Sequence, residues 1–442
     1  MMLREYQRDL YQKTVDAFRQ GYKRPLVCLP CGGGKSYLFA EMAKNTRGDV
    51  LILTHRRELL SQHNALLANR GINARVSMVL TEAKRLGQYP RPALIITDEA
   101  HLSRSNSWMS VLDHYNTFTV GFTATPCRLD GKPLGDMYDT LIEGVTVKWL
   151  IEHQRLAPFE YYAPTEVNTD GLRVVGGDYV IGDMEQLMTG RAIYSDVLKS
   201  WKRFAGGGKT IAYCVSVKHA KETAEMFREA GYSAQAIDGG MPDKQREEIM
   251  SKFRGGDINV LCNVGIISEG ISINDVTCCL LLRPTESHAL YWQQAMRCMR
   301  YQPKKTAIII DCVGNYTRNP LPDADVTWSL TQQAKKRDKL DENGNFYVRV
   351  CMSCYKTFKA APVCPYCGEV YQLSPREIKA HEDIELAKIT EAEIAKVEEQ
   401  KKRMRMEVGR CQTLADLWEI ARQRGYAPGW VYKMAQAKGI KR

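Results

Sequence analysis

No apolar run in the chain approaches the roughly 18–20 residues that a membrane-spanning helix needs, and the N-terminal residues lack the apolar core of a secretory signal peptide. We therefore expect no membrane partner. The chain holds 14 cysteines. Because no secretory signal precedes them, these cysteines are expected as thiols or metal ligands in a reducing, cytoplasmic compartment rather than as disulfides.

Acidic residues are scarce near the C-terminus, where residues 401–442 hold three of them against eleven lysines and arginines. The whole chain has a formal net charge of +11. This asymmetry favours a polyanionic partner such as a nucleic acid, because neutralised phosphates release counterions. A basic tail that only contacts solvent is the alternative. At 442 residues the chain is also too long for one hydrophobic core, so several domains are expected.

One glycine is missing from the pattern G-x-x-x-x-G-K-[ST], because Leu29 stands at its first position, but residues 26–36 otherwise have the composition of a phosphate loop. A short apolar run ends at Pro30, and three glycines lead to a lysine and a serine. Glycines let backbone N–H groups approach phosphate oxygens, a lysine reaches the β- and γ-phosphates, and a hydroxyl ligates Mg²⁺. The alternative is a glycine-rich turn before an ordinary helix. The predicted ligands of the nucleotide are Gly32, Gly33, Gly34, Lys35 and Ser36.

An acidic pair, Asp98 and Glu99, follows the apolar residues 94–97. In a nucleotide hydrolase, the end of a second buried strand is where an Mg²⁺-holding aspartate and a water-activating carboxylate lie. We predict that Asp98 binds Mg²⁺ and that Glu99 is the general base. Taken alone, residues 98–101 could instead form a surface turn after a strand, but the phosphate loop upstream argues against that alternative.

Strand and helix patterns alternate over residues 1–150, which predicts a parallel sheet with helices on both faces and ligands at the carboxyl ends of the strands. Residues 151–205 have weak strand signals and are expected to form a connector with an insertion. The alternation resumes over residues 206–320 without a second phosphate loop. Two α/β lobes are therefore expected, and the second lobe should complete the nucleotide site. The expected strands are 26–29, 50–53, 94–97, 119–122, 210–215, 234–237, 258–262, 277–282 and 306–311.

Two arginines within residues 293–300 offer the positive charge that the transition state of phosphoryl transfer requires. On a helix, Arg297 and Arg300 would lie three residues apart on one face. A guanidinium group directed at the γ-phosphate across a cleft stabilises developing charge, because it is planar and permanently charged. A solvent-exposed basic helix is the alternative.

These motifs, in this order over residues 3–318, resemble those of superfamily-two helicases of the DEAD/DEAH type. Within that superfamily, residues 282–287 and 311–315 look like the second lobe of the RadD-like group, which is similar to XPB-like proteins and includes short phage and prophage versions. The resemblance implies two tandem RecA-like lobes that bind ATP and Mg²⁺.

The same resemblance assigns roles to further residues. It implies that Arg4 and Gln7 read adenine, that His101, Thr123 and Thr125 couple hydrolysis to lobe movement, and that Gly270 and Gln293 complete the ATP site. It also implies nucleic-acid contacts for Thr54, His55, Arg56 and Arg57. The chain departs from the family at Met296, where glycine is usual, and at Ser272, where aspartate is common. These departures are expected to affect how efficiently ATP hydrolysis is coupled to lobe movement, rather than ATP binding.

Four cysteines in the pattern C-x₂-C-x₉-C-x₂-C follow a linker expected at residues 321–345. Two paired thiolates on tight turns make a closed tetrahedral site, which suits structural Zn²⁺. Reduced cysteines without a metal are the alternative. We predict a zinc ribbon over residues 346–372, similar to the cysteine-rich modules that follow the motor in RadD-like proteins. Its ligands would be Cys351, Cys354, Cys364 and Cys367.

Residues 373–442 are expected to form a basic helical region, with a long exposed helix over 374–408 that ends at Gly409. Aromatic residues among the basic ones suit base stacking with phosphate contact. Equally, Trp418 and Trp430 could form the core of a small helical module.

Together these features predict an ATP-dependent DNA helicase or translocase that acts in repair, recombination or replication. Its expected partners are single-stranded, forked or junction DNA, contacted largely without sequence specificity, and recombination or single-strand-binding proteins. A monomer is expected, in a bacterial or phage-infected cell. Two alternatives remain: an RNA helicase with the same motor, and a DNA-binding scaffold that uses ATP as a structural or switch ligand.

Overall fold

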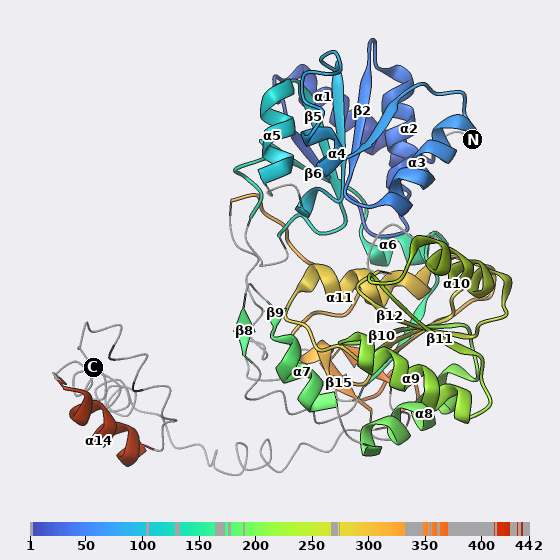
Figure 1. Ribbon diagram of the computed structural model, residues 1–442, viewed down its shortest axis with the longest axis vertical. Helices are drawn as coiled ribbons and strands as arrows, with labels where there is room; N and C mark the ends of the chain where they lie inside the picture. Colours follow the sequence, from blue (N-terminus) through green and yellow to red (C-terminus); the bar gives the residue numbers. More distant parts are fainter. Residues whose placement is uncertain are drawn as a thin grey trace. The chain divides into compact units, whose positions relative to one another are not determined.

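The computed structural model divides the chain into two units, Met1–Val370 and Tyr371–Arg442. It describes residues 3–102, 106–128, 133–163, 173–175, 178–188, 191–266, 273, 275–331, 348–351, 354, 356–359, 363–369, 411, 413–424, 431 and 435. In the described residues, the first unit contains two α/β lobes and two small antiparallel hairpins (Figure 1). No helix in the described ranges is long and apolar enough to cross a membrane.

The first lobe is built on a parallel sheet, which in the described residues has six strands in the order β3-β2-β4-β5-β1-β6. Its strands are β1 (Pro25–Cys28), β2 (Val50–Thr54), β3 (Arg75–Met78), β4 (Leu94–Asp98), β5 (Phe118–Thr123) and β6 (Thr140–Glu143). Its helices are α1 (Glu5–Arg19), α2 (Lys35–Asn45), α3 (Arg57–Ala68), α4 (Val79–Ala83), the 3₁₀ turn η1 (Ala100–Leu102) and α5 (Asn106–Tyr115).

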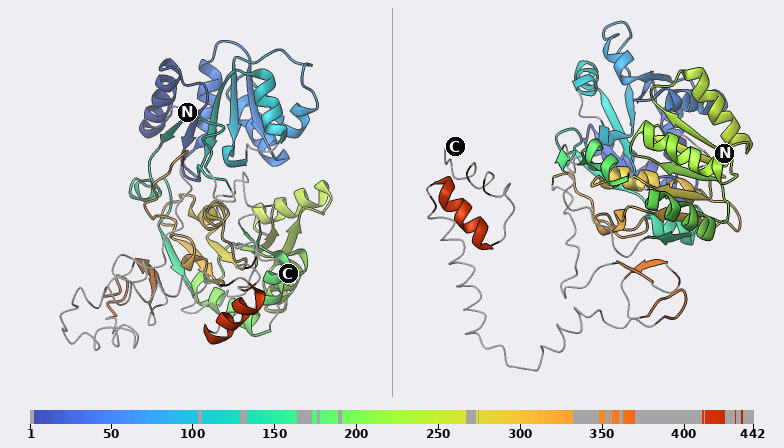
Figure 2. Two further views of the ribbon diagram at one scale, coloured as in Figure 1. Left: turned by 90° about the vertical axis from the view of Figure 1, so that its left-hand side faces the viewer. Right: turned by 60° about the horizontal axis from the view of Figure 1, so that its bottom comes forward.

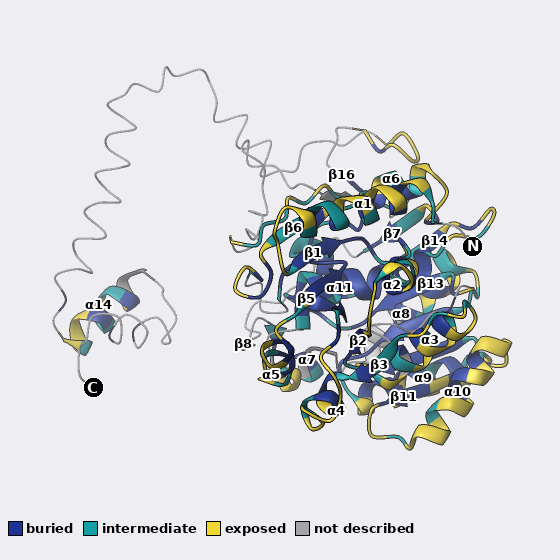
Figure 3. Ribbon diagram, turned by 90° about the horizontal axis from the view of Figure 1, so that it is seen from above, coloured by how far each residue is buried: buried dark blue, intermediate teal, exposed yellow. Residues whose placement is uncertain are grey.

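Both faces of this sheet are buried, because successive side chains of each strand point to opposite sides. Val27 and Ile52 pack on one face against residues of α1 and α2. Their neighbours Leu26 and Leu51 pack on the other face against Trp108 of α5. The central strands β1 and β5 are accordingly mostly dark blue, the colour of buried residues, in Figure 3. The apolar runs of the sequence thus form the centre of a doubly covered sheet.

The second lobe repeats this architecture, with strands in the order β11-β12-β10-β13-β14-β7, all parallel in the described residues. Its strands are β7 (Phe159–Tyr162), β10 (Thr210–Tyr213), β11 (Ala234–Asp238), β12 (Val260–Val264), β13 (Cys278–Leu281) and β14 (Ala307–Asp311). Its helices and turns are α8 (Arg191–Ala205), α9 (Val217–Glu229), α10 (Asp243–Gly255), α11 (His288–Ala295), η2 (Met296–Met299) and η3 (Asn315–Thr317).

Helices also cover both faces of the second sheet. Ile211 and Leu261 pack against Phe253 of α10. Ala212 and Cys262 face the other side, with Trp201 of α8 and Phe227 of α9. Two tandem parallel-sheet lobes, as expected from the sequence, are therefore confirmed.

The nine expected strands all occur, but β3, β6 and β7 were not expected. Each of the three lies at an edge of its sheet. β7 falls within residues 151–205, which were expected to be a connector, so the second sheet begins before residue 206. The same stretch contains β8 (Val174–Val175), β9 (Asp178–Tyr179) and α7 (Ile181–Met188) after α6 (Val147–Glu152), and it ends with α8.

A hairpin of β15 (Val348–Val350) and β16 (Thr357–Lys359), orange in Figure 2, follows the second lobe. Lys356 pairs in antiparallel fashion with Tyr162 of β7, and its ammonium contacts the Glu160 carboxylate. In the second unit, α14 (Leu414–Arg424) packs through Leu417 and Ala421 against Val431. Trp418 lies partly buried against this cluster, which favours its role in a helical core. The helix expected over 374–408 and the partner tryptophan at position 430 lie outside the described residues.

Candidate active site and metal centre

The phosphate loop (residues 30–36) connects β1 to α2 at the carboxyl edge of the first sheet. α2 begins at Lys35, and Ser36 is its second residue. Gly32 and Gly34 have φ values of +82° and +89°, a region that favours glycine. A Cβ on Gly33 would lie 2.7 Å from the Leu29 side chain, so the residue that replaces the first glycine of the motif packs directly beneath the loop.

The start of α1 is hydrogen-bonded to this loop. The Tyr6 hydroxyl and the Gln7 amide donate hydrogen bonds to the Gly33 carbonyl oxygen at 2.8 and 3.0 Å. The Arg4 backbone N–H donates to Gln7 Oε1 at 3.0 Å. The structure therefore brings Arg4 and Gln7 to the nucleotide site, and their adenine contacts stay a prediction.

Lys35 and Glu99 face each other across the site, with 3.6 Å between Nζ and Oε1. Burial of Lys35 disfavours its charged form, but the charge of the Glu99 carboxylate and other neighbouring acidic groups outweighs burial, so the pKa of Lys35 is raised. Glu99 adopts a φ of +51°, which is uncommon for a residue with a side chain. The turn after β4 thus directs this carboxylate toward the loop.

Asp98 is held through both carboxylate oxygens. Its Oδ1 accepts a hydrogen bond from the Glu99 backbone N–H at 3.0 Å, and its Oδ2 lies 2.9 Å from Nε2 of His63 on α3. Burial disfavours the carboxylate, but the hydrogen bond from His63 outweighs burial and lowers the pKa of Asp98. Asp98 is therefore an anion, as a ligand of Mg²⁺ must be.

The predicted coupling residues form a chain of contacts between the lobes. Thr123 Oγ1 donates to the Thr125 carbonyl oxygen at 2.9 Å, so its contact with His101 Nδ1 at 3.1 Å requires a proton on that nitrogen. The other ring nitrogen of His101 then accepts from the Gln293 amide, 3.3 Å away. His101, which follows the acidic pair Asp98 and Glu99, thus contacts both Thr123 in the first lobe and Gln293 on α11 of the second lobe.

The expected helix through both arginines is wrong. α11 ends at Ala295, Arg297 lies in the 3₁₀ turn η2, and Arg300 is extended. The helix stops because the Met299 carbonyl oxygen accepts a hydrogen bond from the Ala157 backbone N–H at 2.8 Å and Arg300 pairs with Leu156. Contacts from the connector override the local helical preference.

Arg300 still faces the phosphate loop. Burial lowers the pKa of its guanidinium to about 10, the neighbouring Arg297 adds to this effect, and Cys31 of the loop and Tyr37 of α2 oppose it. Cys31 and Tyr37 of the first lobe are therefore electrostatic neighbours of Arg300 in the second lobe. Positive charge from Lys35 and the two arginines at this site suits a triphosphate.

The residues predicted to contact nucleic acid lie at the boundary of the two lobes. Arg56 donates to the carbonyl oxygens of Gly265 and Ile266 at 3.0 and 2.8 Å. Arg57 pairs with Asp243 of α10 at 2.8 Å, between exposed side chains. Arg56 Nε also donates to His55 at 3.0 Å. Thr54 is completely buried, so its side chain does not reach the surface in this arrangement. Gly270 and Ser272 lie outside the described residues.

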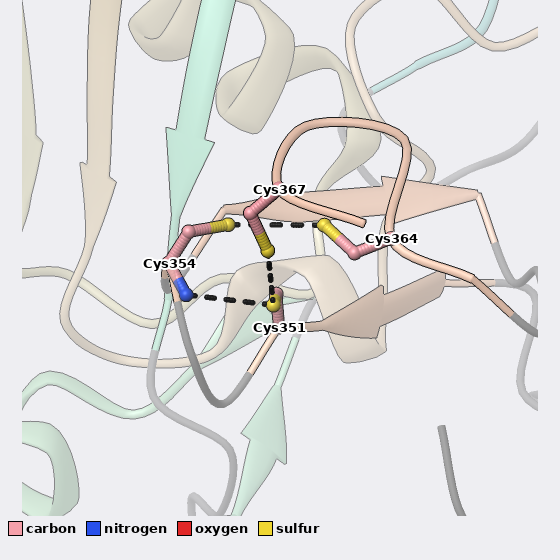
Figure 4. A group of neighbouring side chains, drawn as sticks. All are labelled: Cys351, Cys354, Cys364 and Cys367. Atoms are coloured by element: carbon pink, nitrogen blue, oxygen red, sulfur yellow. Dashed lines mark hydrogen bonds between the residues drawn. The ribbon is translucent and has the colours of Figure 1, made fainter. Parts of the chain in front are cut away.

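Four thiols gather on the β15–β16 hairpin and the turn that follows it (Figure 4). The Sγ atoms of Cys351 and Cys367 are 3.5 Å apart, and those of Cys354 and Cys364 are 3.8 Å apart. All four lie within 4.8 Å of one another. A tetrahedral site with Zn–S bonds of about 2.3 Å requires roughly 3.8 Å between thiolates. The donor set therefore fits a tetrahedral metal ion.

Sequence reasoning missed His63 and the contact of Tyr6 with the phosphate loop. No sequence motif identifies the contact partner of either residue, because each contact joins segments that are separate in the sequence. His63 joins α3 to the end of β4, and Tyr6 joins α1 to the loop. The phosphate loop also fits its expected ligands on structural grounds: Glu99 Oε2 is buried without a hydrogen bond, and a Cβ at Gly32, Gly33 or Gly34 would clash with a neighbouring side chain. Lys35, Ser36, Asp98 and Glu99 are suitable donors for a magnesium nucleotide.

Comparisons with known proteins identify the family of this chain. Residues 1–88 and 76–128 match the family "Type III restriction enzyme, res subunit", and residues 193–302 match "Helicase conserved C-terminal domain". A "51.5 kDa protein" of a Lactococcus phage is 36% identical over 409 residues, which cover 90% of this chain and 88% of the relative. The "Putative ATP-dependent helicase IRC3" of Saccharomyces cerevisiae is 29% identical, over 71% of this chain and 52% of its own length.

A solved structure, the ATP-dependent type ISP restriction-modification enzyme LlaBIII bound to DNA, shares the fold with a TM-score of 0.52 at 16% identity. That alignment covers 74% of this chain and 28% of the enzyme. The fold, the paired motifs and these relatives define a nucleic-acid-dependent ATPase. The chain belongs to the superfamily-two helicases and has a relative in a phage.

Proposed function

We propose that this helicase is a DNA translocase that uses ATP to move along one strand, in repair, recombination or replication. The observation that carries the proposal is the contact of Gln293 with His101, because it joins the second lobe to the acidic motif of the first. A scaffold that bound ATP only as a structural ligand would not need a nucleotide site completed by two lobes.

Each charged residue of the site has a proposed role. Lys35 and the loop glycines bind the phosphates, and Ser36 with Asp98 holds Mg²⁺, which supplies charge neutralisation at the phosphate oxygens when bound. Glu99 accepts the proton of the attacking water. Arg297 and Arg300 stabilise the negative charge that develops on the γ-phosphate. Arg4 and Gln7 contact the adenine, and Gly270 with Gln293 completes the site.

DNA is the proposed substrate because the matched family and the solved neighbour are restriction enzymes, one of them bound to DNA. His55, Arg56 and Arg57 contact its phosphates at the lobe boundary, so recognition does not depend on sequence. The basic region 373–442 adds to this affinity. The phage relative supports action in a bacterial or phage-infected cell, where recombination and single-strand-binding proteins are available partners.

The four cysteines are proposed to hold a structural Zn²⁺, because four thiolates leave no open coordination position for catalysis. The hairpin that carries Cys351 contacts β7 through Lys356. The metal would therefore stabilise a module that is attached to the second lobe.

The test is ATP turnover of the full chain with single-stranded, forked and four-way-junction DNA and with RNA of the same sequences. Stimulation by DNA and displacement of a block from single-stranded DNA are expected. Stimulation by RNA alone would identify an RNA helicase. Turnover that no nucleic acid changes, or no turnover at all, would favour the scaffold.

A further inference from the structure

His63 is a buried histidine that contacts Asp98 in the ATPase site from α3, six residues beyond the last predicted nucleic-acid contact, Arg57. It lies on α3, and its Nε2 is 2.9 Å from Oδ2 of Asp98. The two side chains are 3% and 5% exposed, so water does not compete for this contact. A buried polar side chain that contacts a functional carboxylate this closely requires a physical explanation.

The direction of the hydrogen bond follows from the partners of Asp98. An ionised carboxylate only accepts hydrogen bonds, so His63 donates from a protonated Nε2. The other oxygen, Oδ1, accepts from the Glu99 backbone N–H at 3.0 Å. With one donor on each oxygen, the carboxylate plane of Asp98 cannot rotate without losing a buried hydrogen bond. Each oxygen keeps a further lone pair for another ligand.

The orientation of the His63 ring is itself fixed by packing. The ring lies against Phe39 of α2 with 5.3 Å between centroids, and Phe39 packs against Phe122 of β5 at 4.6 Å. These two contacts join the histidine to the helix that follows the phosphate loop and to the sheet below it. His63 is therefore a rigid donor rather than a side chain that follows Asp98.

We propose that His63 is a positioning residue that holds the Asp98 carboxylate in the orientation required for Mg²⁺ binding. This inference rests on the proposed function, since it takes Asp98 as the metal-binding carboxylate. Hydrogen bonds to a ligating group from outside the coordination sphere typically contribute 10- to 100-fold, as an order of magnitude, to metal affinity.

The same helix connects Asp98 to the lobe boundary. Arg56 and Arg57, at the start of α3, contact Gly265, Ile266 and Asp243 of the second lobe. His63 follows Arg57 by six residues, or about 9 Å along the helix axis. A shift of α3 caused by nucleic acid or by the second lobe would move the His63 donor and change the metal site.

The experiment measures metal binding directly, with Mn²⁺ followed by electron paramagnetic resonance in the presence of a non-hydrolysable ATP analogue. It uses the full chain and the variants His63→Leu, which removes the donor, and His63→Gln, which keeps an amide donor. His219→Leu is the matched control, because His219 is also buried, lies on α9 and contacts the Val215 backbone.

His63→Leu should bind Mn²⁺ about 10- to 100-fold more weakly than the native chain, while metal-free nucleotide binding is unchanged. His63→Gln should recover most of the affinity, and His219→Leu should match the native chain. If His63→Leu does not fold, His63→Asn, whose shorter side chain withdraws the donor, should show the same loss relative to His63→Gln. Native Mn²⁺ affinity in a folded Leu or Asn variant would overturn the inference.

This measurement needs no nucleic acid, so it separates the inference from the proposed function. A native chain whose ATPase ignores DNA would contradict the proposed translocase, whereas the Mn²⁺ result would still decide the role of His63.

Discussion

Gln293 of the second lobe lies 3.3 Å from His101 of the first, between side-chain nitrogens that are both buried. Because His101 must donate through Nδ1 to Thr123, its Nε2 is the acceptor for the Gln293 amide. This contact joins the two lobes, because His101 follows the acidic pair of the first lobe and Gln293 lies on α11 of the second. Loss of either side chain should therefore uncouple lobe closure from hydrolysis.

We predict that Gln293→Ala and His101→Ala each lower the stimulation of ATPase activity by nucleic acid. The double variant should lose less than the sum of the single losses, with a coupling energy of about 0.5–3 kcal/mol. Steady-state ATPase assays with and without DNA provide the measurement. Gln294→Ala is the control, since Gln294 is equally buried on the same helix. Strictly additive effects of the two changes would contradict the coupling role.

Glu99→Gln should lower kcat by about 10²–10⁴-fold, because an amide cannot accept the proton of the attacking water. Nucleotide affinity should be retained, since Lys35 and the loop remain. A fluorescent ATP analogue measures binding, and phosphate release measures turnover. Glu143→Gln, an exposed change at the end of β6, is the control. Turnover at the native rate in Glu99→Gln would mean that another group is the base.

Catalysis should require the guanidinium groups of Arg297 and Arg300, and not only their positive charge. Arg300→Lys is expected to lower kcat by about 10³-fold, the lower end of the range for arginine fingers, with a smaller effect on nucleotide binding. Arg254→Lys, exposed on α10, should have no effect. Single-turnover hydrolysis under saturating DNA gives the comparison. If the Arg300→Lys variant were as active as the control, Arg300 would not be a catalytic residue.

An ion pair between the buried Glu82 and the partly exposed Arg75 in the first lobe makes stability depend on pH. The Tyr115 hydroxyl donates to Glu82 at 2.7 Å, and Arg75 pairs with the other oxygen of the same carboxylate. Burial disfavours the ionised Glu82, but these partners outweigh it and lower its pKa. Glu82→Gln should cost about 3 kcal/mol of unfolding free energy near neutral pH.

The sign of the pH effect follows from this lowered pKa. The Glu82 contribution is complete above its unfolded pKa of about 4.3 and is lost as pH falls through the lower folded value. The difference between native and Glu82→Gln chains in urea unfolding should therefore shrink below about pH 4. Glu222→Gln, in an exposed pair on α9, should change stability by less than about 1 kcal/mol. A pH-independent difference would refute the assignment.

Removal of metal should unfold the cysteine module. Elemental analysis should find about one zinc per chain, and Cys364→Ser should lose it, whereas Cys312→Ser, outside the cluster, should keep it. A chelator should lower the melting temperature of the native chain but not of Cys364→Ser. A native chain without bound metal that keeps its stability would show that the thiols are only reduced cysteines.

The fold could be predicted from the sequence wherever a strand is buried on both faces, as for β1 and β4, because such strands are continuous apolar runs. The edge strands β3, β6 and β7 could not be predicted in this way, since each is only partly buried and mixes polar with apolar residues. The site motifs were found because local sequence specifies them. The end of α11 and the role of His63 depend on contacts with distant segments, which local sequence does not encode.

The attachment of the cysteine hairpin to β7 has a consequence for solubility. β7 is the outermost strand of its parallel sheet, and Lys356 bonds to its free side at Tyr162. An outer strand without such a cover offers unpaired backbone groups to other chains. If the four thiols hold a metal ion, its loss would uncover that strand, and the metal-free protein should then self-associate through β7 even while its nucleotide-binding lobes stay folded.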